Sequence, residues 1–155
     1  ETLAFDVIRA HLEELVAAVE SAPRGSLSAA ESLRAMAVAL LEAYRDADAE
    51  HKVQIDALRL LSAEHQATLK HLERTLVRAF TDAIAALAPG LDRDRRRLMP
   101  LTMSLFGMLN WHYLWFREDG PMGRQEYAAL AATLVEAGVE RLVRDAGAAR
   151  LTAAE

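Results

Sequence analysis

The chain has 155 residues, of which 52% are hydrophobic and 26% charged, and glycine (7) and proline (4) are scarce. This length suits one domain with its own core, and the composition excludes collagen-like, proline-rich and disordered classes. The absence of cysteine excludes disulfides, cysteine-ligated metals and thiol nucleophiles. The formal net charge of −5 makes this stretch a poor binder of polyanions, so any contact with nucleic acid requires another segment.

The balance of residue types predicts an all-α fold. Alanine (31) and leucine (24) greatly outnumber valine (9) and isoleucine (3), which is typical of helices and not of sheets. No apolar run reaches the roughly 20 residues of a membrane span, and the first segment carries acids where a signal peptide would be basic and then apolar. We therefore expect a cytoplasmic helical bundle of about six helices without a membrane contact.

The first two predicted helices have clear boundaries. The first occupies the start of the chain and ends at the breaker run of residues 21–25, which contains Pro23 and Gly25. The second begins at Ser28, because Ser28 and Glu31 have the spacing of a capping box.

Two further helices are predicted before residue 90. A short third helix would bury Ile55, Leu58 and Leu61. A long fourth helix would run from about Ala63 to Ala88 and end at the Pro-Gly pair of residues 89–90.

The fifth and sixth helices point to self-association. The fifth opens near Asp92, and its stretch from residue 98 to 111 is apolar almost all round, so that it must be covered on both sides. In a domain this small, the second cover is most economically another copy of the chain. The last helix, from about Arg124 to Arg144, is its natural partner in a dimeric four-helix bundle. We assign residues 1–145 to the domain and expect residues 146–155 to be a disordered tail.

Motifs for catalysis or metal binding are missing from the sequence. No histidine has a glutamate three residues before it, as a carboxylate-bridged di-iron bundle requires, and only Asp48-x-x-His51 comes close. There is no His-Glu-x-x-His, no Gly-x-Ser-x-Gly and no glycine-rich phosphate loop. We expect no metal, no cofactor and no enzymatic activity.

Polar residues of the apolar fifth helix need partners if that helix is covered on both sides. Three explanations are open: bonds within the helix for Thr102 and Ser104, pairing across a dimer seam for His112, and contact with a ligand for Asn110 beside Trp111. For Asn110, a structural role and a ligand-facing role are equally favoured.

Several of these features together resemble the C-terminal domain of TetR/AcrR-type transcriptional regulators, over essentially the whole chain. They are the helix order, the Pro-Gly stop, the Gly-Met-Leu-Asn-Trp stretch at 107–111, the Trp-Phe-Arg ending at 115–117 and the Asp-Gly-Pro turn at 119–121. Within that family, these motifs look most like the branch that senses acyl-CoA thioesters and related acids.

The resemblance implies that residues 1 to about 21 connect the ligand domain to a DNA-binding head, and that the fifth and sixth helices form the dimer. It also implies an N-terminal helix-turn-helix of roughly 50 residues, which this sequence lacks, so operator DNA would be bound only through that missing segment. We expect the ligand-sensing and dimerisation domain of a homodimeric repressor, controlled by a small apolar or acyl-CoA-type effector. The alternatives are a helical dimerisation module without a ligand and, less favoured, a cofactor-holding bundle enzyme.

The expected effector pocket is enclosed by the first, second, fourth and fifth helices. Gly107 would allow close approach to the backbone, Asn110 would supply a directional hydrogen bond and Trp111 a flat apolar wall. The eight predicted ligand-binding residues are Leu40, Leu69, Leu72, Met103, Phe106, Gly107, Asn110 and Trp111. The eight predicted dimer-interface residues are Leu101, Leu105, Met108, His112, Tyr127, Leu130, Leu134 and Gly138.

Overall fold

The computed structural model describes residues 2–23, 25–45, 61–91 and 94–152, and all its regular elements in these ranges are helices. They are α1 (Thr2–Ser21), α2 (Ala29–Ala43), α4 (Ala63–Ala85), α5 (Arg95–Asn110), the short 3-10 helix η3 (His112–Leu114) and α6 (Arg124–Thr152). The predicted all-α class is confirmed. The expected third helix, with Ile55 and Leu58, lies outside the described residues, as do Asp48 and His51.

Local chemistry sets the helix boundaries at the positions where breakers and caps were predicted. The amide of Ser28 donates to Glu31 Oε2 at 2.8 Å, and the amide of Glu31 donates to Ser28 Oγ at 3.2 Å, so the capping box that opens α2 is present. After α4, Gly90 has a φ of 83°, a backbone conformation that glycine adopts without steric cost.

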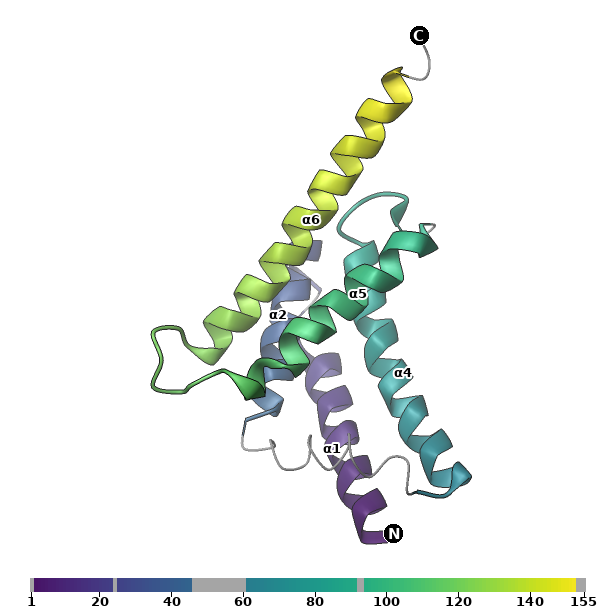
Figure 1. The fold of residues 1–155 in the computed structure, drawn as a ribbon, viewed down its shortest axis with the longest axis vertical. Coiled ribbons are helices and arrows are strands. Elements are labelled where there is room, and N and C mark those ends of the chain that lie inside the picture. Colours follow the sequence, from purple (N-terminus) through teal and green to yellow (C-terminus); the bar gives the residue numbers. More distant parts are fainter. Residues whose placement is uncertain (1, 24, 46–60, 92–93, 153–155) are drawn as a thin grey trace.

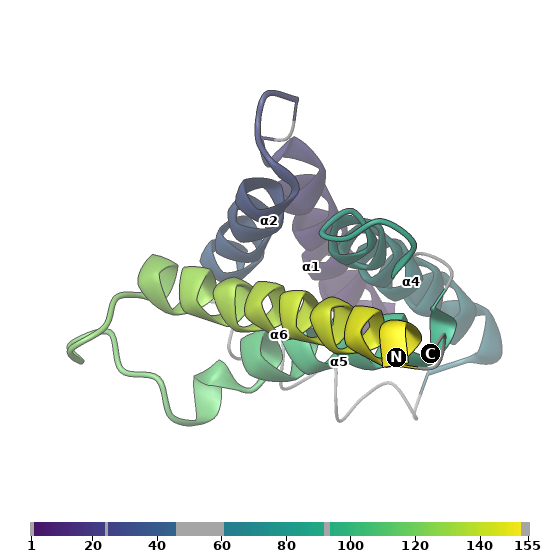
Figure 2. The ribbon, with the colours of Figure 1, turned by 90° about the horizontal axis from the view of Figure 1, so that it is seen from above.

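The helices form two layers around one core (Figures 1 and 2). α5 and α6 run across one side of the molecule, and α1, α2 and α4 lie behind them, with α6 packed chiefly on α2 and α1 packed between α2 and α4. Large side chains that are fully buried come from α1, α2, α4 and α5, among them Leu12, Leu40, Phe80 and Leu105. α1 is therefore built into the core along much of its length.

α6 is longer than predicted. The sequence pattern placed its end at about Arg144 and assigned residues 146–155 to a disordered tail, yet the helix continues to Thr152 and projects past the other helices (Figure 1). Alanine is the best helix former, and Arg141 forms an i,i+4 ion pair with Asp145 at 2.9 Å; because residues 145–148 are at most partly buried, these local effects account for the continued helix there.

Candidate functional site

A cavity of about 210 Å³ lies between α1, α2, α4 and α5. Most of its wall is apolar, and three polar groups interrupt it: the hydroxyl of Tyr44 just after α2, Glu73 on α4 and Asn110 at the end of α5. The lining residues are Leu12, Leu15, Tyr44, Glu73, Leu76, Val77, Met103, Phe106 and Asn110. An apolar hollow with few polar groups is typical of small-molecule sites.

Tyr44 and Asn110 form the polar corner of this cavity. The Tyr44 hydroxyl donates to Asn110 Oδ1 at 2.8 Å. Burial raises the pKa of Tyr44 well above its ordinary value of 10.0, because the phenolate is unfavourable in an apolar surrounding. The hydroxyl therefore stays protonated and holds the Asn110 side-chain carbonyl.

Three of the predicted ligand residues, Met103, Phe106 and Asn110, meet in this cavity. Leu40 and Leu69 do not line it, because both are fully buried in the core. Leu72 is partly buried and packs against the core without reaching the cavity. These three leucines share the inward face of α2 or α4 with true lining residues, and periodicity alone does not separate core from cavity wall.

Gly107 and Trp111 lie next to the cavity on the surface of α5 but do not line it. No atom lies within 4 Å of the position that a Gly107 Cβ would occupy, and Trp111 is 63% exposed. At 100° per residue, Gly107 lies about 40° and Trp111 about 80° from Met103, on the side away from Phe106, where the surface of α5 is exposed. The structure thus does not bring them to the cavity.

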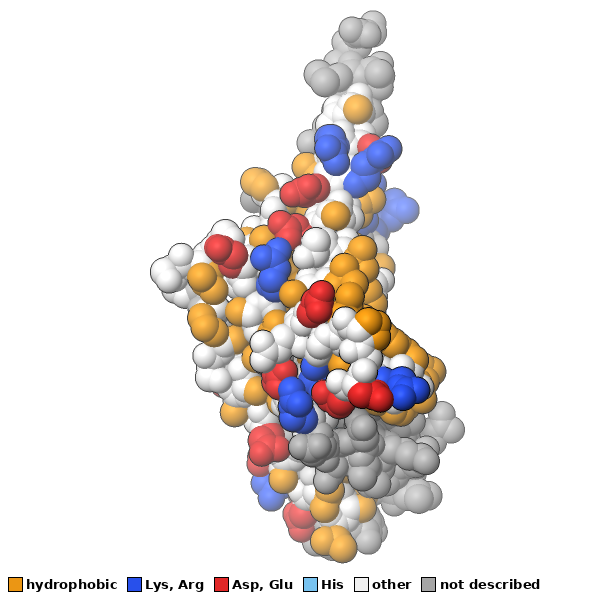
Figure 3. Space-filling model, turned by 90° about the vertical axis from the view of Figure 1, so that its left-hand side faces the viewer, with side chains coloured by type: hydrophobic (Ala, Val, Ile, Leu, Met, Phe, Trp, Pro, Cys, Tyr) orange, Lys and Arg blue, Asp and Glu red, His pale blue; other side chains and the backbone are white. Residues whose placement is uncertain are grey.

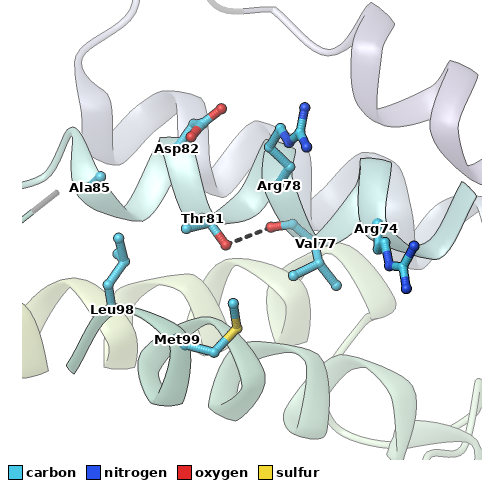
Figure 4. Close-up of a pocket in the computed structure, with 8 residues that line it drawn as sticks. All are labelled: Arg74, Val77, Arg78, Thr81, Asp82, Ala85, Leu98 and Met99. Atoms are coloured by element: carbon cyan, nitrogen blue, oxygen red, sulfur yellow. Dashed lines mark hydrogen bonds between the residues drawn. The ribbon is translucent and has the colours of Figure 1, made fainter. Parts of the chain in front are cut away.

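A wider and more open hollow of about 520 Å³ lies along the outside of the α4–α5 contact (Figure 4). Leu98 and Met99 of α5 face Thr81 and Ala85 of α4, while Arg74, Arg78 and Asp82 supply charges of both signs at its rim. Val77 lines both hollows, and its carbonyl accepts a hydrogen bond from Thr81 Oγ1 at 2.7 Å. We favour the smaller cavity as the site because residues of α1, α4 and α5, together with Tyr44 at the end of α2, converge on it.

Exposed apolar residues, together termed the exposed apolar face, lie on the segment that follows α5 and on α6. Trp111, Leu114 and Trp115 are 57–63% exposed, and Leu130 and Leu134 of α6 are 42% and 55% exposed. Seen from the side of the segment that joins α5 to α6, hydrophobic side chains gather along one edge of the molecule (Figure 3). Patches of this kind mark association surfaces in soluble proteins.

The predicted interface residues divide into two groups. Leu130 and Leu134 are exposed, and Leu101, Met108, Tyr127 and Gly138 are partly exposed. Leu105 and His112 are buried within the single chain, at 0% and 2% exposure, and offer no surface to a second copy. They were assigned to the wrong face because, in a helix that is apolar all round, the sequence pattern does not show which side faces the core.

His112 is instead bound inside the chain. Its Nδ1 donates to the Leu109 carbonyl at 2.9 Å, and its Nε2 accepts from Arg124 Nη1 at 3.0 Å. Arg124 Nη1 also lies 3.3 Å from the Leu41 carbonyl, and its Nε donates to Glu118 at 2.9 Å. This arginine joins the end of α2, the turn after α5 and the start of α6.

Arg124 is not among the functional residues predicted from the sequence. One signal was available, since a cation in the first turn of a helix opposes the helix dipole and needs a partner elsewhere. The explanation offered for Thr102 and Ser104 is confirmed: both hydroxyls donate within α5, to the Leu98 carbonyl at 2.9 Å and the Pro100 carbonyl at 2.8 Å.

Within the described residues, no cluster of three or more histidine, aspartate or glutamate side chains is arranged to hold a metal ion. Over the same ranges, none of the helices combines the length and apolar character that crossing a bilayer requires.

Residues 26–139 match the family model described as "Tetracyclin repressor-like, C-terminal domain". The chain belongs to this family. The match spans α2 to most of α6 and includes Tyr44, Asn110 and the exposed apolar face. The assignment is to a family of transcriptional-regulator domains and not to a family of enzymes. A comparison with curated proteins gives no significant match.

Solved structures of TetR-family proteins have the same fold. A TetR-family transcriptional regulator from Bordetella parapertussis 12822 aligns with a TM-score of 0.78 at 25% identity, over 85% of this chain and 69% of its own. A regulatory protein in the tetR family from Rhodococcus RHA1 aligns at 0.73 and 21% identity, over 88% and 72%. PfmR from Thermus thermophilus, a TetR-family transcriptional regulator, aligns at 0.70 and 23% identity, over 85% and 72%.

Proposed function

We propose that this chain is the ligand-sensing and dimerisation domain of a TetR-like transcriptional regulator, and that the cavity between α1, α2, α4 and α5 holds the effector. The observation that carries the proposal is the composition of the cavity wall: a mostly apolar lining with one oriented amide at Asn110. Those are the four helices that the sequence pattern assigned to the pocket. The effector is a small apolar molecule or the acyl part of a thioester.

The link to regulation runs through α1. Leu12 and Leu15 of this helix are about 1% exposed and line the cavity, so the occupant of the cavity touches α1 directly. A ligand that fits one tilt of α1 better than another shifts the population toward that tilt. The shift depends on this difference in affinity, because a ligand that binds both tilts equally leaves their populations unchanged. Operator DNA would be bound by a helix-turn-helix joined to α1, and repression relieved by the effector is the mode we propose.

The exposed apolar face supports the dimer part of the proposal. We propose that Leu101, Met108, Tyr127, Leu130, Leu134 and Gly138 form the interface, with Trp111 added and with Leu105 and His112 removed. Small residues on α6, such as Gly138, allow helices to approach closely. A homodimer sets the spacing between two α1 helices, and any tilt of α1 becomes a change in that spacing.

Native mass spectrometry of the purified chain tests the proposal. We expect a dimer mass, together with an added mass of a small molecule retained from the expression host or taken up from an added probe. A dimer that never takes up a small molecule would favour the alternative, a helical dimerisation module without a ligand. A monomer with nothing bound would contradict both parts of the proposal.

A further inference from the structure

The outer hollow between α4 and α5 is separate from the cavity of the proposed function. Its volume of about 520 Å³ is the larger of the two, and Val77 is the only described residue that lines both. Because a helix rises about 1.5 Å per residue, the stretch of α4 that lines the hollow, from Arg74 to Ala85, is about 16 Å long. The hollow is therefore a groove whose length suits an elongated ligand.

The floor of this groove is mainly apolar. Val77 and Ala85 of α4 line it together with Leu98 and Met99 of α5, and Met99 is 48% exposed. The Thr81 hydroxyl donates to the Val77 carbonyl at 2.7 Å, so this hydroxyl has its own acceptor within α4. A hydrocarbon chain laid along the floor would remove exposed apolar surface from water, which is favourable.

The charged side chains that line the groove all lie on α4, in a fixed order (Figure 4). Arg74 and Arg78 come first, Asp82 follows one helical turn later, and all three are exposed. Within the part of the chain that the structure describes, none of the three takes part in an ion pair or a side-chain hydrogen bond. Two guanidinium groups are thus available to an anion at one end of the groove, and a carboxylate lies toward the other end.

We propose that this groove binds a free fatty carboxylate, which has a linear alkyl chain and one anionic end. The carboxylate lies between Arg74 and Arg78, because the planar guanidinium group matches the two oxygens of a carboxylate. The chain runs over Val77 and Met99 toward Ala85. Asp82 sets this direction, since a ligand carboxylate at its end of the groove would meet a like charge. This site does not depend on the effector cavity of the proposed function.

Three probes with the same alkyl chain isolate the role of the charge. They are octanoate, 1-octanol and octyltrimethylammonium, each kept at pH 7 below its solubility limit or critical micelle concentration. Their affinities for the full chain are measured by NMR titration of ¹³C-labelled methionine methyl groups. Met99 reports on the groove and Met103 on the inner cavity. We expect octanoate to shift the Met99 signal and to bind more tightly than either of the other probes.

The double variant Arg74→Gln/Arg78→Gln removes both cations at exposed positions and is therefore expected to fold. The ratio of octanoate affinity to octanol affinity should be about threefold to tenfold lower in this variant than in the wild type, as for two exposed ion pairs. The control Arg117→Gln/Arg141→Gln removes the same charge from two other exposed arginines, which pair with Asp119 and Asp145 and do not line the groove. It should keep the wild-type ratio.

The contrary outcomes separate this inference from the proposed function. If octanol binds as tightly as octanoate, or if the ratio is the same in the wild type and in Arg74→Gln/Arg78→Gln, the requirement for an anion is wrong. If octanoate shifts Met103 but not Met99, it occupies the inner cavity, and the groove is excluded while the proposed function stands. If vesicles of phosphatidylglycerol bind the chain while octanoate leaves Met99 unchanged, the two arginines face a lipid surface, and the inference is also wrong.

Discussion

Arg124 holds three parts of the chain together although it is a single side chain at the start of α6. It is 7% exposed and bonds to His112, Glu118 and the Leu41 carbonyl. Its ring contact with Phe116, at 5.3 Å from the guanidinium carbon to the ring centre, covers one face of the cation. A buried cation with this many partners contributes stability only while all of them are present.

We predict that Arg124→Ala lowers the free energy of unfolding by about 2 kcal/mol, because His112 Nε2 and the Leu41 carbonyl are left without their donor. Urea unfolding followed by circular dichroism measures this loss. The matched control is Arg141→Ala, which removes an exposed ion pair with Asp145 on the same helix and should change the free energy by less than about 0.5 kcal/mol. Equal losses in both variants would contradict the role given to Arg124.

The contacts of Arg124 depend on pH through Glu118. The hydrogen bond from Arg124 lowers the pKa of Glu118 below its ordinary value of 4.5, and the charges of Arg124 and Arg45 add to this. A lowered folded-state pKa stabilises the fold above the unfolded value, and this stabilisation is lost as the pH falls through the folded value.

The difference in the free energy of unfolding between the wild type and Glu118→Gln should therefore have its largest value at pH 7 and should decrease once the pH falls below about 4.5. Chemical unfolding at a series of pH values measures it. Glu118 is 54% exposed, so added salt should reduce the difference as well. A difference that grows on acidification would show that the junction is held by other groups.

At the scale of the helix, α5 shows how far sequence periodicity reaches. Its existence and its place in the core could be predicted, because a run rich in leucine, methionine and phenylalanine has few alternatives even with Pro100 inside it. The rotation of α5 about its own axis could not be predicted, because apolar residues occur on all of its sides. The structure turns Phe106 and Asn110 to the cavity, Leu105 to the core, and Gly107 and Trp111 to solvent.

The end of α6 shows a second limit. A frayed tail was predicted after Arg144 because the residues there are small, but alanine-rich segments need little packing to remain helical, and residues 145–148 are at most partly buried. The Tyr44–Asn110 contact, which joins residues 66 positions apart, has no signature in local sequence and could be found only from the structure.

Two leucines on the paired helices test the faces assigned to α5 and α6. Leu134→Glu places a charge on the exposed apolar face, where the partner would bury it, and should convert a folded dimer into a folded monomer. Leu105→Glu places the charge in the protomer core and should unfold the chain. Sedimentation and circular dichroism distinguish these results. A folded, dimeric Leu134→Glu variant would exclude this face as the interface.

At the scale of the whole molecule, the proposed function joins two surfaces that lie on different sides of α5. The cavity touches α1 through Leu12 and Leu15, and Trp111, which follows Asn110 in the sequence, belongs to the exposed apolar face. The C-terminal end of α5 is thus next to both the proposed effector site and the proposed dimer seam. A ligand that alters how α1 packs would change the relation between the two α1 helices of a dimer.

The distance between the α1 helices of two protomers is the quantity that tests this account most directly. The chain has no cysteine, so Ala10→Cys, at an exposed position of α1, accepts a single spin label. Pulsed electron paramagnetic resonance then measures the label-to-label distance with and without a saturating amount of the small molecule that native mass spectrometry finds bound. We predict one distance distribution in the free protein and a displaced distribution with this ligand. The absence of any inter-label distance, or a distribution that the bound ligand leaves unchanged, would contradict the account.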